Sequence, residues 1–219
     1  MSEPQVFLFA DLAGFTALTE AHGDEHAADL VEEFLREAAA LLPRHAGEHI
    51  KTIGDALMLR VSSAAEAIRL GLELTGEIMP NHGYPAIHVG MHYGPALRRG
   101  GDWFGATVNL AARISALAAG GEVLLSEATR NAAGQLDGVQ LQDRGPHRLH
   151  NVTQPIRLFA AVSLDRRHDD APIDPVCRMA IDPNRCAGAL MHEGVKYHFC
   201  SLECAARFAA TPEVYLSLA

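Results

Sequence analysis

A hairpin signal in the first third of the chain limits which folds are possible. Residues 49–61 (HIKTIGDALMLRV) read as two strands joined by a turn at Gly54 and Asp55, because glycine accepts the positive φ that a tight hairpin needs. Helical and strand patterns alternate along the chain around this segment. A hairpin inside such an alternation predicts an α+β domain with an antiparallel or mixed sheet. We expect Asp55 at the exposed tip of the hairpin.

Hydrophobic periodicity predicts the other elements. Residues 5–10 (QVFLFA) are an apolar run typical of a buried strand, and Asp11 follows at once. Apolar residues between Leu30 and Leu42 recur on one helical face, and Pro43 ends that helix. The remaining predicted elements are a helix capped by Ser62 or Ser63 that reaches about Met79, a strand over 86–93, a glycine-rich bend at 100–101, a helix over 106–118, and strands over 122–125 and 156–162.

Two histidines share one face of the predicted strand over 86–93. His88 and His92 lie opposite the apolar residues of that strand. A metal-binding pair would need a third ligand nearby, and the sequence offers none. Partly covered polar positions on a strand are therefore the favoured interpretation.

Size and charge exclude several classes of protein. The chain has 219 residues, enough for one ordinary domain and a small one, and its 48% hydrophobic and 21% charged residues are typical of a globular protein. A formal net charge of -9 argues against a nucleic-acid partner, since binding a polyanion requires a basic face. Of the 18 basic residues only Lys51 and Lys196 are lysines, a bias typical of an arginine-rich bacterial proteome.

Neither a membrane segment nor a targeting segment is predicted. The longest stretch without Asp, Glu, Lys or Arg, residues 78–97, contains three prolines, three histidines and an asparagine, which a bilayer would not tolerate. Residues 1–10 lack the basic and apolar regions of a secretory signal. A cytoplasmic location is expected.

All four cysteines lie in the last fifth of the chain, between Cys177 and Cys204. They cannot form a disulfide framework for the whole protein, and in a reducing compartment such clustering favours metal ligands. The stretch before them, from Leu164 to Asp174, is charged, contains Pro172 and shows no periodicity. These features predict a domain over 1–163, a linker over 164–173 and a second domain over 174–219.

Two aspartates could act together as metal ligands. Asp11 follows a buried strand and Asp55 lies on a hairpin tip, so neighbouring strand ends could present both carboxylates. Paired carboxylates suit Mg²⁺ or Mn²⁺, which in turn bind polyphosphate. Loop aspartates are also common turn formers. The turn after Asp11 favours the metal interpretation, because backbone N–H groups that lead into a helix form a phosphate cradle.

A third polar group falls on the predicted helix over 106–118. Asn109 and Arg113 are spaced i and i+4, so they share one helix face. Such an arginine can stabilise charge on a phosphoryl group, and the asparagine can hold a sugar oxygen. A helix cap with a solvated arginine one turn later is an equally good interpretation of this segment alone.

Three ordered blocks resemble a known family. FLFADLAGFT, KTIGDALM and GDWFGATVNLAARI, in that order, are similar to the class III adenylyl/guanylyl cyclase homology domain over roughly residues 5–163. The resemblance implies a ferredoxin-like α+β domain that works as an antiparallel homodimer, with each active site built across the interface. It implies that Asp11 and Asp55 bind two metal ions, Mg²⁺ or Mn²⁺, with the Leu12 carbonyl as a further ligand. The loop of Ala13, Gly14, Phe15 and Thr16 is the expected phosphate cradle.

The other subunit would complete each site. The resemblance implies that Lys51 and Asp102 read the base, and that Asn109 and Arg113 position the ribose and stabilise the transition state. Adenine presents an acceptor at N1 and a donor at N6, which match a lysine donor and an aspartate acceptor. A guanylyl cyclase would be expected to have glutamate at 51 and an uncharged residue at 102, so ATP is the expected substrate.

One segment departs from the family pattern. RLHNV puts His150 where a phosphate-binding lysine is expected. Histidine is mostly neutral at neutral pH, which would weaken the triphosphate clamp or make it pH-sensitive. Arg148 is a possible substitute.

The C-terminal segment resembles the YHS domain, a small module related to treble-clef metal knuckles. Tyr197-His198-Phe199 stands where the motif that names the family begins. The resemblance implies that Cys177, Cys200 and Cys204 bind Zn²⁺ or another soft metal, with His198 a weaker candidate for the fourth position. Cys186 is left over and is interpreted as a small buried residue. A module this small also needs a metal merely to fold, so sensing and structural roles both stay open.

The resulting hypothesis is an adenylyl cyclase that converts ATP to cyclic AMP and pyrophosphate, with a C-terminal metal-binding module that regulates or positions it. The first alternative is a catalytically silent nucleotide-binding module that relays metal occupancy to a partner. The second alternative is a guanylyl cyclase.

Overall fold

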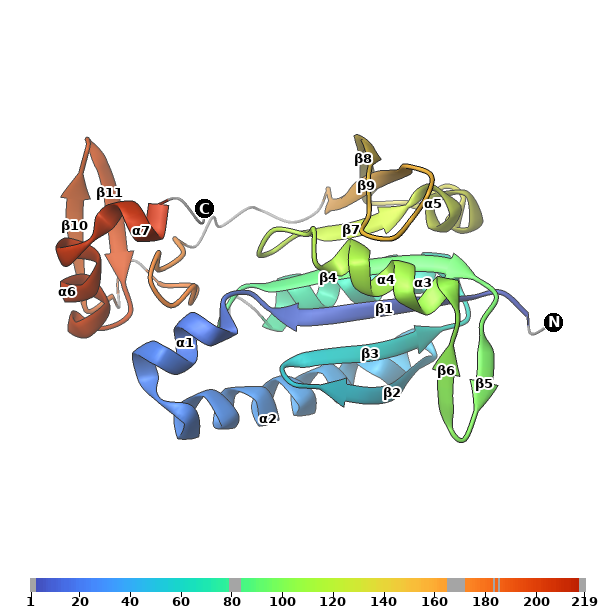
Figure 1. Cartoon of the computed structure of the whole chain (residues 1–219), viewed down its shortest axis with the longest axis horizontal. Helices are drawn as coiled ribbons and strands as arrows, with labels where there is room; N and C mark the ends of the chain where they lie inside the picture. Colours follow the sequence, from blue (N-terminus) through green and yellow to red (C-terminus); the bar gives the residue numbers. More distant parts are fainter. Residues whose placement is uncertain (1–2, 79–83, 165–171, 183, 185, 217–219) are drawn as a thin grey trace.

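The computed structural model describes residues 3–78, 84–164, 172–182, 184, 186 and the segment 187–216. Seven strands from the first 163 residues form one mixed sheet in the order β2-β3-β1-β4-β7-β9-β8 (Figure 1). The strands are β1 Gln5–Leu12, β2 Gly47–Ile53, β3 Ala56–Val61, β4 Ile87–Gly94, β7 Val123–Ser126, β8 Val139–His147 and β9 Ile156–Ser163.

The strand pairing confirms the expected fold class. Only β4 and β7 pair in parallel, and all other neighbours in the sheet are antiparallel. The first four strands lie in the order β2-β3-β1-β4, which is the ferredoxin-like arrangement. The hairpin at Gly54 and Asp55 forms as predicted, with Ile53 opposite Ala56 and Gly54 at a φ of 63°.

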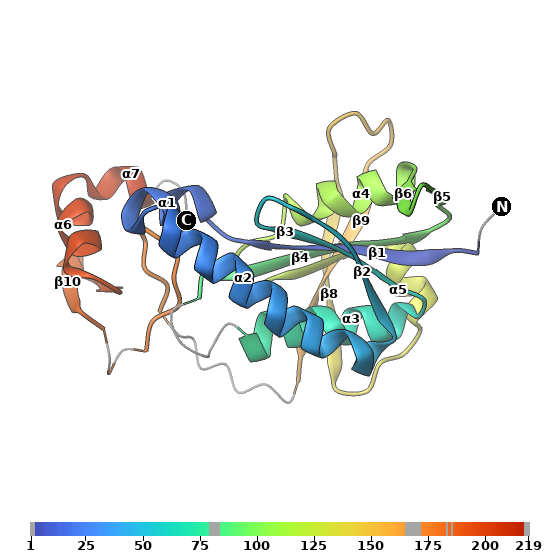
Figure 2. The same ribbon diagram turned by 90° about the horizontal axis from the view of Figure 1, so that it is seen from below.

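Helices cover both faces of this sheet (Figure 2). α2 (Asp24–Leu41) and α3 (Ala64–Glu73) lie on one face, and α4 (Ala106–Ser115) lies on the other. Alternate residues of β1 serve the two cores, because Val6 and Leu8 pack with α2 and α3, whereas Phe7 and Phe9 pack with α4. α2 starts at Asp24, earlier than the predicted apolar face, and a 3₁₀ turn with Pro43 follows it.

The remaining helix ends differ slightly from the sequence-based expectation. Ser63 caps α3, and its hydroxyl accepts a hydrogen bond from the Glu66 amide. α3 continues into a π turn, Leu74–Ile78, and the predicted end near Met79 lies outside the described residues. α4 ends at Ser115, three residues before the predicted end.

A glycine fixes where α4 crosses the sheet. Gly90 of β4 lies directly beneath the C-terminal end of α4, and a Cβ at this position would overlap the Ser115 backbone. The Ser115 hydroxyl donates to the Phe9 carbonyl of β1 at 3.1 Å. This close approach sets the height and the register of the helix over β1 and β4.

Several elements were not predicted. β5 (Leu97–Arg99) and β6 (Asp102–Phe104) form a small hairpin where the sequence suggests only a glycine-rich bend. α5 (Glu127–Ala133) and strand β8 were also missed. Trp103 holds the β5–β6 hairpin to the sheet, since it is buried with its ring 5.4 Å from that of Phe7.

The C-terminal module lies beside α1 (Phe15–His22) in both ribbon views (Figures 1 and 2). It consists of a turn around Cys177, the hairpin β10 (Gly188–His192) and β11 (Val195–Phe199), and the helices α6 (Leu202–Ala210) and α7 (Pro212–Leu216). Of the predicted linker 164–173, residues 165–171 lie outside the described residues. None of the helices that the structure describes is long and apolar enough to cross a membrane.

Candidate functional site

Two carboxylates meet where β1 ends. Ala10 of β1 pairs with Leu57 of β3, so the β2–β3 turn falls beside the end of β1. Asp11 follows the same alternation as Phe7 and Phe9 and lies on the α4 side of the sheet. Its carboxylate lies close enough to that of Asp55 for each to shift the pKa of the other. The sheet therefore brings the two predicted metal ligands together.

A histidine also contacts this pair. His88 of β4 is the register partner of Asp11, and its Nε2 lies 3.5 Å from Asp11 Oδ2. Burial raises the pKa of Asp11, but hydrogen bonding and charge attraction from His88 outweigh burial, so the pKa is lowered overall. The sequence interpretation of His88 as a covered polar position missed this contact with a candidate ligand.

The second carboxylate is held less favourably. Burial and the negative charge of Asp11 raise the pKa of Asp55 to about 6. A cation bound between the two carboxylates would offset the repulsion between them and would favour the ionised form of Asp55. Oxygen ligands of this kind fit Mg²⁺ or Mn²⁺.

The loop after Asp11 turns sharply into α1. Gly14 has a φ of 72° and precedes the first residue of the helix. The amides of Phe15 and Thr16 begin α1, where the first N–H groups have no partner within the helix and can bind an anion. Ala13 does not fit the predicted cradle, because its N–H donates to the Ala86 carbonyl at 2.7 Å.

The two residues expected to read the base contact each other. Lys51 Nζ of β2 lies 2.5 Å from Asp102 Oδ2 of β6. Asp102 Oδ1 also accepts from the Trp103 amide at 2.8 Å. Hydrogen bonds from Lys51 and from that amide hold the pKa of Asp102 below its ordinary value, so this carboxylate is an acceptor at neutral pH.

The predicted catalytic pair projects from α4. Asn109 is exposed and Arg113 is half-buried, one turn further along the helix. Within the described part of the chain, neither side chain has a hydrogen bond or ion pair, so none joins this pair to the two aspartates. One chain thus presents three separate polar groups: the two aspartates, the Lys51–Asp102 pair and the α4 pair.

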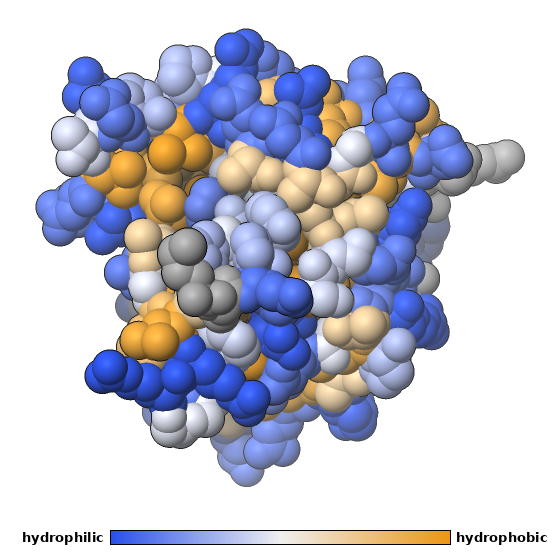
Figure 3. Space-filling model, turned by 90° about the vertical axis from the view of Figure 1, so that its right-hand side faces the viewer, coloured by the Kyte–Doolittle hydropathy of each residue, from blue (hydrophilic) through white to orange (hydrophobic). Residues whose placement is uncertain are grey.

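Apolar side chains are exposed near two of these groups. Ile53, beside the turn that carries Asp55, is 51% exposed, and Phe104, two residues after Asp102, is 50% exposed. Leu97 of β5 is similarly open. A space-filling view toward the end that carries β5 and β6 shows apolar patches among the hydrophilic side chains (Figure 3). Such patches are typical of surfaces that meet another chain.

At the segment that departs from the family pattern, both candidate phosphate ligands are exposed to solvent. His150 and Arg148 are exposed in the connection between β8 and β9. Only Leu149 between them is buried.

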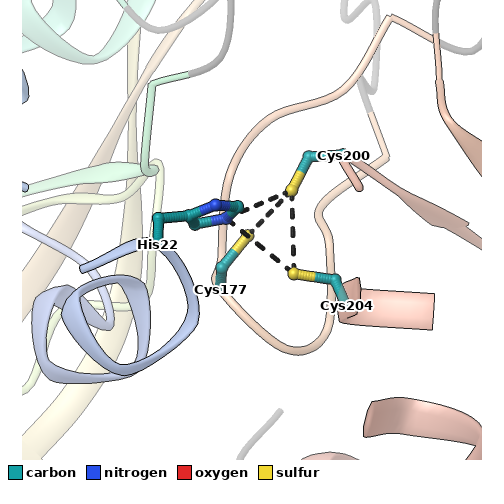
Figure 4. A group of neighbouring side chains, drawn as sticks. All are labelled: His22, Cys177, Cys200 and Cys204. Atoms are coloured by element: carbon teal, nitrogen blue, oxygen red, sulfur yellow. Dashed lines mark hydrogen bonds between the residues drawn. The ribbon is translucent and has the colours of Figure 1, made fainter. Parts of the chain in front are cut away.

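A second site lies between the C-terminal module and α1. Cys177 comes from a turn, Cys200 follows β11, Cys204 lies in α6, and His22 is the last residue of α1. Figure 4 shows the four side chains converging on one centre. Their ligand atoms all lie within 4.8 Å of one another. Three of these residues were predicted as ligands from the sequence, and His22 was not.

The separations within this cluster suit a metal ion. Cys200 Sγ lies 3.3 Å from Cys177 Sγ and 3.8 Å from Cys204 Sγ. His22 Nε2 lies 3.5 Å from Cys200 Sγ and 3.9 Å from Cys204 Sγ. Hydrogen bonding from Cys177 and Cys200 lowers the pKa of the Cys204 thiol, which favours a shared thiolate. Thiolates with one imidazole are a donor set typical of zinc.

A buried carboxylate holds the cluster's backbone. Asp174 is fully buried, and its Oδ1 accepts from the Val176 amide at 2.8 Å. Its Oδ2 accepts from the Cys200 amide at 2.9 Å. Asp174 therefore ties the turn that carries Cys177 to the end of β11 that carries Cys200.

The other predicted donors do not join the cluster. His198, expected as the weaker candidate for the fourth position, lies on β11 opposite Ala189, and its Nδ1 is buried without a hydrogen-bond partner among the described residues. Cys186 is half-buried and lies outside the cluster. His22 lies 178 residues before Cys200, so no spacing in the sequence could have indicated it.

Comparisons with known proteins agree with these observations. Residues 173–219 match the YHS domain. A pH-sensitive adenylate cyclase of Mycobacterium tuberculosis is 37% identical over 69% of this chain and 38% of the relative. An adenylate cyclase of Streptomyces griseus is 32% identical over 80% of this chain and 44% of the relative. The chain spans less than half the length of these two relatives.

Solved structures show the same fold. The adenylyl cyclase CyaB from P. aeruginosa has a TM-score of 0.63 at 23% identity, covering 76% of this chain and 96% of that one. An adenylate cyclase from Trypanosoma brucei, solved in the monomeric state, has a TM-score of 0.69 at 23% identity, covering 76% and 91%. Residues 2–159 match the adenylate and guanylate cyclase catalytic domain. The chain therefore belongs to the class III adenylate/guanylate cyclase family and carries a YHS domain behind its cyclase domain.

Proposed function

We propose that the chain is an adenylyl cyclase, which converts ATP to 3′,5′-cyclic AMP and pyrophosphate as a homodimer. The observation that favours ATP as the substrate is the contact between Lys51 and Asp102. It places one donor and one acceptor side by side within one chain. Adenine offers an acceptor at N1 and a donor at N6, so both groups find a partner of the right kind. Guanine has the opposite polarity at both positions.

Asp11 and Asp55 are the proposed ligands of two Mg²⁺ or Mn²⁺ ions, together with the Leu12 carbonyl. The carboxylate pair fits such a group because burial and mutual repulsion leave Asp55 reluctant to ionise without a cation. Bound there, the ions would supply charge neutralisation for the triphosphate and would favour the alkoxide form of the ribose oxygen.

The reaction joins the ribose 3′-oxygen to the α-phosphorus and breaks the bond between that phosphorus and the β-phosphate oxygen. The 3′-hydroxyl proton leaves to solvent, and pyrophosphate departs. Arg113 is the proposed donor to the charge that gathers on the α-phosphate, and Asn109 is the proposed ribose ligand. The amides of Phe15 and Thr16 would receive the phosphates at the start of α1.

A homodimer completes the site in this proposal. Within the described residues of one chain, no hydrogen bond or ion pair joins Asn109 and Arg113 to the aspartates, and in this proposal the second copy brings its own Asn109 and Arg113 to the nucleotide. A twofold axis would give two equivalent sites, because each chain holds both halves. The exposed apolar side chains Ile53, Leu97 and Phe104 are candidates for this interface.

The C-terminal module is proposed to bind Zn²⁺ or another thiophilic metal. Three thiols, one imidazole and a buried carboxylate that orders two of the ligand segments support this assignment. Coordination by four side chains is typical of a closed site that holds its ion without a substrate position.

A single assay tests the proposal. The purified full chain is incubated with Mn²⁺ and either ATP or GTP, and cyclic nucleotide and pyrophosphate are followed together. Cyclic AMP formation with equal pyrophosphate, abolished by Asp11→Ala, is the expected result. Binding of ATP without product would instead make the chain a silent nucleotide-binding module. Faster turnover of GTP would make it a guanylyl cyclase.

A further inference from the structure

We propose that His22 of the cyclase domain is the fourth ligand of the C-terminal metal site. One ion then links the two domains. Through this link the ion controls the phosphate loop, which is the loop between Asp11 and α1. The three cysteines come from the YHS domain, whereas the imidazole comes from α1. A site assembled in this way cannot be filled without fixing the module on the cyclase domain.

Four of the six separations between ligand atoms can be compared with those of a tetrahedral site. With zinc–sulfur and zinc–nitrogen bonds of ordinary length, a tetrahedron has sulfur–sulfur edges of about 3.8 Å and sulfur–nitrogen edges of about 3.6 Å. The cluster has sulfur–sulfur separations of 3.3 and 3.8 Å and sulfur–nitrogen separations of 3.5 and 3.9 Å. The separations of His22 Nε2 from two of the sulfurs are therefore those expected of a fourth ligand.

Among the described residues of the module, no fourth donor joins the three cysteines. Of its other candidates, neither His198 nor Cys186 belongs to the cluster. A closed zinc site needs four protein ligands, and three thiolates would leave a position open. His22 fills it from the neighbouring domain.

The end of α1 is built to hold His22 in place. Gly23, at a φ of 86°, ends the helix directly after His22, and its amide donates to the Thr19 carbonyl at 2.8 Å. The module also contacts this end of α1, because Arg207 of α6 donates a hydrogen bond to the Glu20 carbonyl at 3.0 Å. α1 is thus tied to the module at its C-terminal end and to the phosphate loop at its N-terminal end.

A second connection runs from the cluster to the phosphate loop. Arg178, directly after Cys177, accepts at its carbonyl a hydrogen bond from the Ala86 amide at 3.2 Å. The Ala86 carbonyl in turn accepts from the Ala13 amide at 2.7 Å. The Arg178 side chain also lies against Gly14, where a Cβ would overlap its Cγ. The loop between Asp11 and α1 is therefore held by the same turn that carries a metal ligand.

This arrangement predicts that the ion activates the cyclase. With the ion bound, His22 fixes the position of α1, and Cys177 fixes the turn whose Arg178 carbonyl binds the Ala86 amide. Both segments contact the loop between Asp11 and α1, so the position of that loop is fixed as well. Without it, the bond through His22 is lost, and the Arg207–Glu20 hydrogen bond remains between the module and α1. The effect on catalysis rests on the proposed cyclase reaction, whereas the shared coordination rests only on the proposed C-terminal metal site.

The test measures metal binding by the full chain and two variants. Zn²⁺ affinity is measured by competition with a chromophoric chelator for the wild type, His22→Ala and His26→Ala. His26 is the matched control, because it is exposed and its ring lies 5.5 Å from that of His22, yet it is outside the cluster. His22→Ala is expected to weaken Zn²⁺ binding by at least about tenfold, and His26→Ala to leave it unchanged.

Cobalt spectroscopy identifies the ligands directly. Co²⁺ bound to the wild type is expected to give the visible bands of a tetrahedral site with three sulfurs and one nitrogen. His22→Cys should retain the ion and move the spectrum toward that of four thiolates, which guards against a variant that merely misfolds. Wild-type affinity and spectrum in His22→Ala would overturn the proposal.

Amide hydrogen exchange tests the connection to the loop. Chelation of Zn²⁺ is expected to speed exchange in peptides that contain Ala13 and Ala86 in the wild type. The same peptides of His22→Ala should exchange fast with or without Zn²⁺. Protection that does not change with Zn²⁺ in the wild type would overturn the control of the loop. None of these readouts needs cyclic AMP, so they fail or succeed independently of the proposed reaction.

Discussion

Lys51 Nζ lies 2.5 Å from Asp102 Oδ2, so that β2 and the β5–β6 hairpin present a donor and an acceptor at one point of a single chain. The carboxylate is also held by the Trp103 amide, which leaves its orientation fixed by two donors. A pair oriented in this way can distinguish two bases by polarity rather than by size.

We predict that Lys51→Ala lowers kcat/KM for ATP by about ten- to hundredfold, because a charged hydrogen bond to the base is lost. Lys51→Glu combined with Asp102→Ser should shift the preference toward GTP. Lys196→Ala is the matched control, since it removes the chain's other lysine from an exposed position on β11. Steady-state kinetics with both nucleotides measure these changes, and an unchanged ATP preference in the double variant would show that the pair does not read the base.

The shared active site predicts complementation between inactive variants. Asp11→Ala removes one half of each site and Arg113→Ala removes the other. A heterodimer of the two retains one intact site, so a mixture that assorts at random should recover about a quarter of the wild-type activity per chain. Asp11→Ala mixed with Asp55→Ala is the control, because both changes damage the same half and no intact site can form. Equal activity in the two mixtures would contradict a site shared between subunits.

The local parts of the fold were predictable from the sequence. A buried strand before Asp11, a turn at Gly54 and a serine cap at position 62 or 63 each depend on residues close together in the chain, and all three are confirmed, with Ser63 as the cap. The β5–β6 hairpin was missed because its strands have three residues each, too few for a periodic pattern. Its position depends instead on the packing of Trp103 against Phe7.

The candidate sites were predictable only where ligands follow a local motif. His22 and His88 enter their sites through the tertiary arrangement of α1 and β4, and nothing near them in the sequence marks that role. The sequence around Ala13 fits a phosphate-loop pattern, but the Ala13 N–H already donates to the Ala86 carbonyl. Side-chain chemistry can be read from a sequence, whereas competition for a backbone donor depends on the fold.

We predict that Gly90→Ala is strongly destabilising. The new Cβ would overlap the backbone of Ser115, and a helix backbone cannot move aside as a flexible side chain can. Overpacking of this kind costs about 1–3 kcal/mol of the free energy of unfolding, or more where the backbone must shift. Since α4 carries Asn109 and Arg113, cyclase activity should fall as well. Urea unfolding measures the loss.

The control for this change is Gly188→Ala in β10. The nearest atom to a Cβ at Gly188 is Leu202 Cδ2 at 4.0 Å, an ordinary contact. Gly188→Ala should therefore leave both the unfolding midpoint and the activity near their wild-type values. A Gly90→Ala variant as stable as Gly188→Ala would contradict the close packing of α4 on β4.

Asp55→Asn should stabilise the metal-free protein while removing its activity. Because the folded state raises the pKa of Asp55 from 3.8 to about 6, it binds the proton more tightly than the unfolded state does. Stability in the wild type therefore decreases as pH rises through this window, and above it the ionised pair costs free energy. At pH 8 the variant lacks that cost, so its Tm should be higher by a few degrees.

Manganese should reverse this order. Mn²⁺ is expected to raise the Tm of the wild type and to have little effect on Asp55→Asn, because one carboxylate ligand is gone. Asp137→Asn, a change at an exposed carboxylate far from the site in sequence, controls for the altered net charge. Equal stabilisation of all three proteins by Mn²⁺ would argue against a metal site at Asp55.

His92 should make the cyclase domain acid-sensitive. Burial lowers the pKa of this histidine from 6.5 to about 4, and its Nδ1 lies 2.7 Å from the Ser126 hydroxyl. Between these values the unfolded state binds the proton and the folded state does not, so the free energy of unfolding decreases as pH falls from about 6.5 to about 4. The total loss is up to about 3 kcal/mol.

In chelator-treated protein, urea unfolding of His92→Gln should therefore show a flatter pH dependence than the wild type, whereas His49→Gln, at an exposed position, should not. Parallel curves for the wild type and His92→Gln would exclude this histidine as the source of the acid sensitivity.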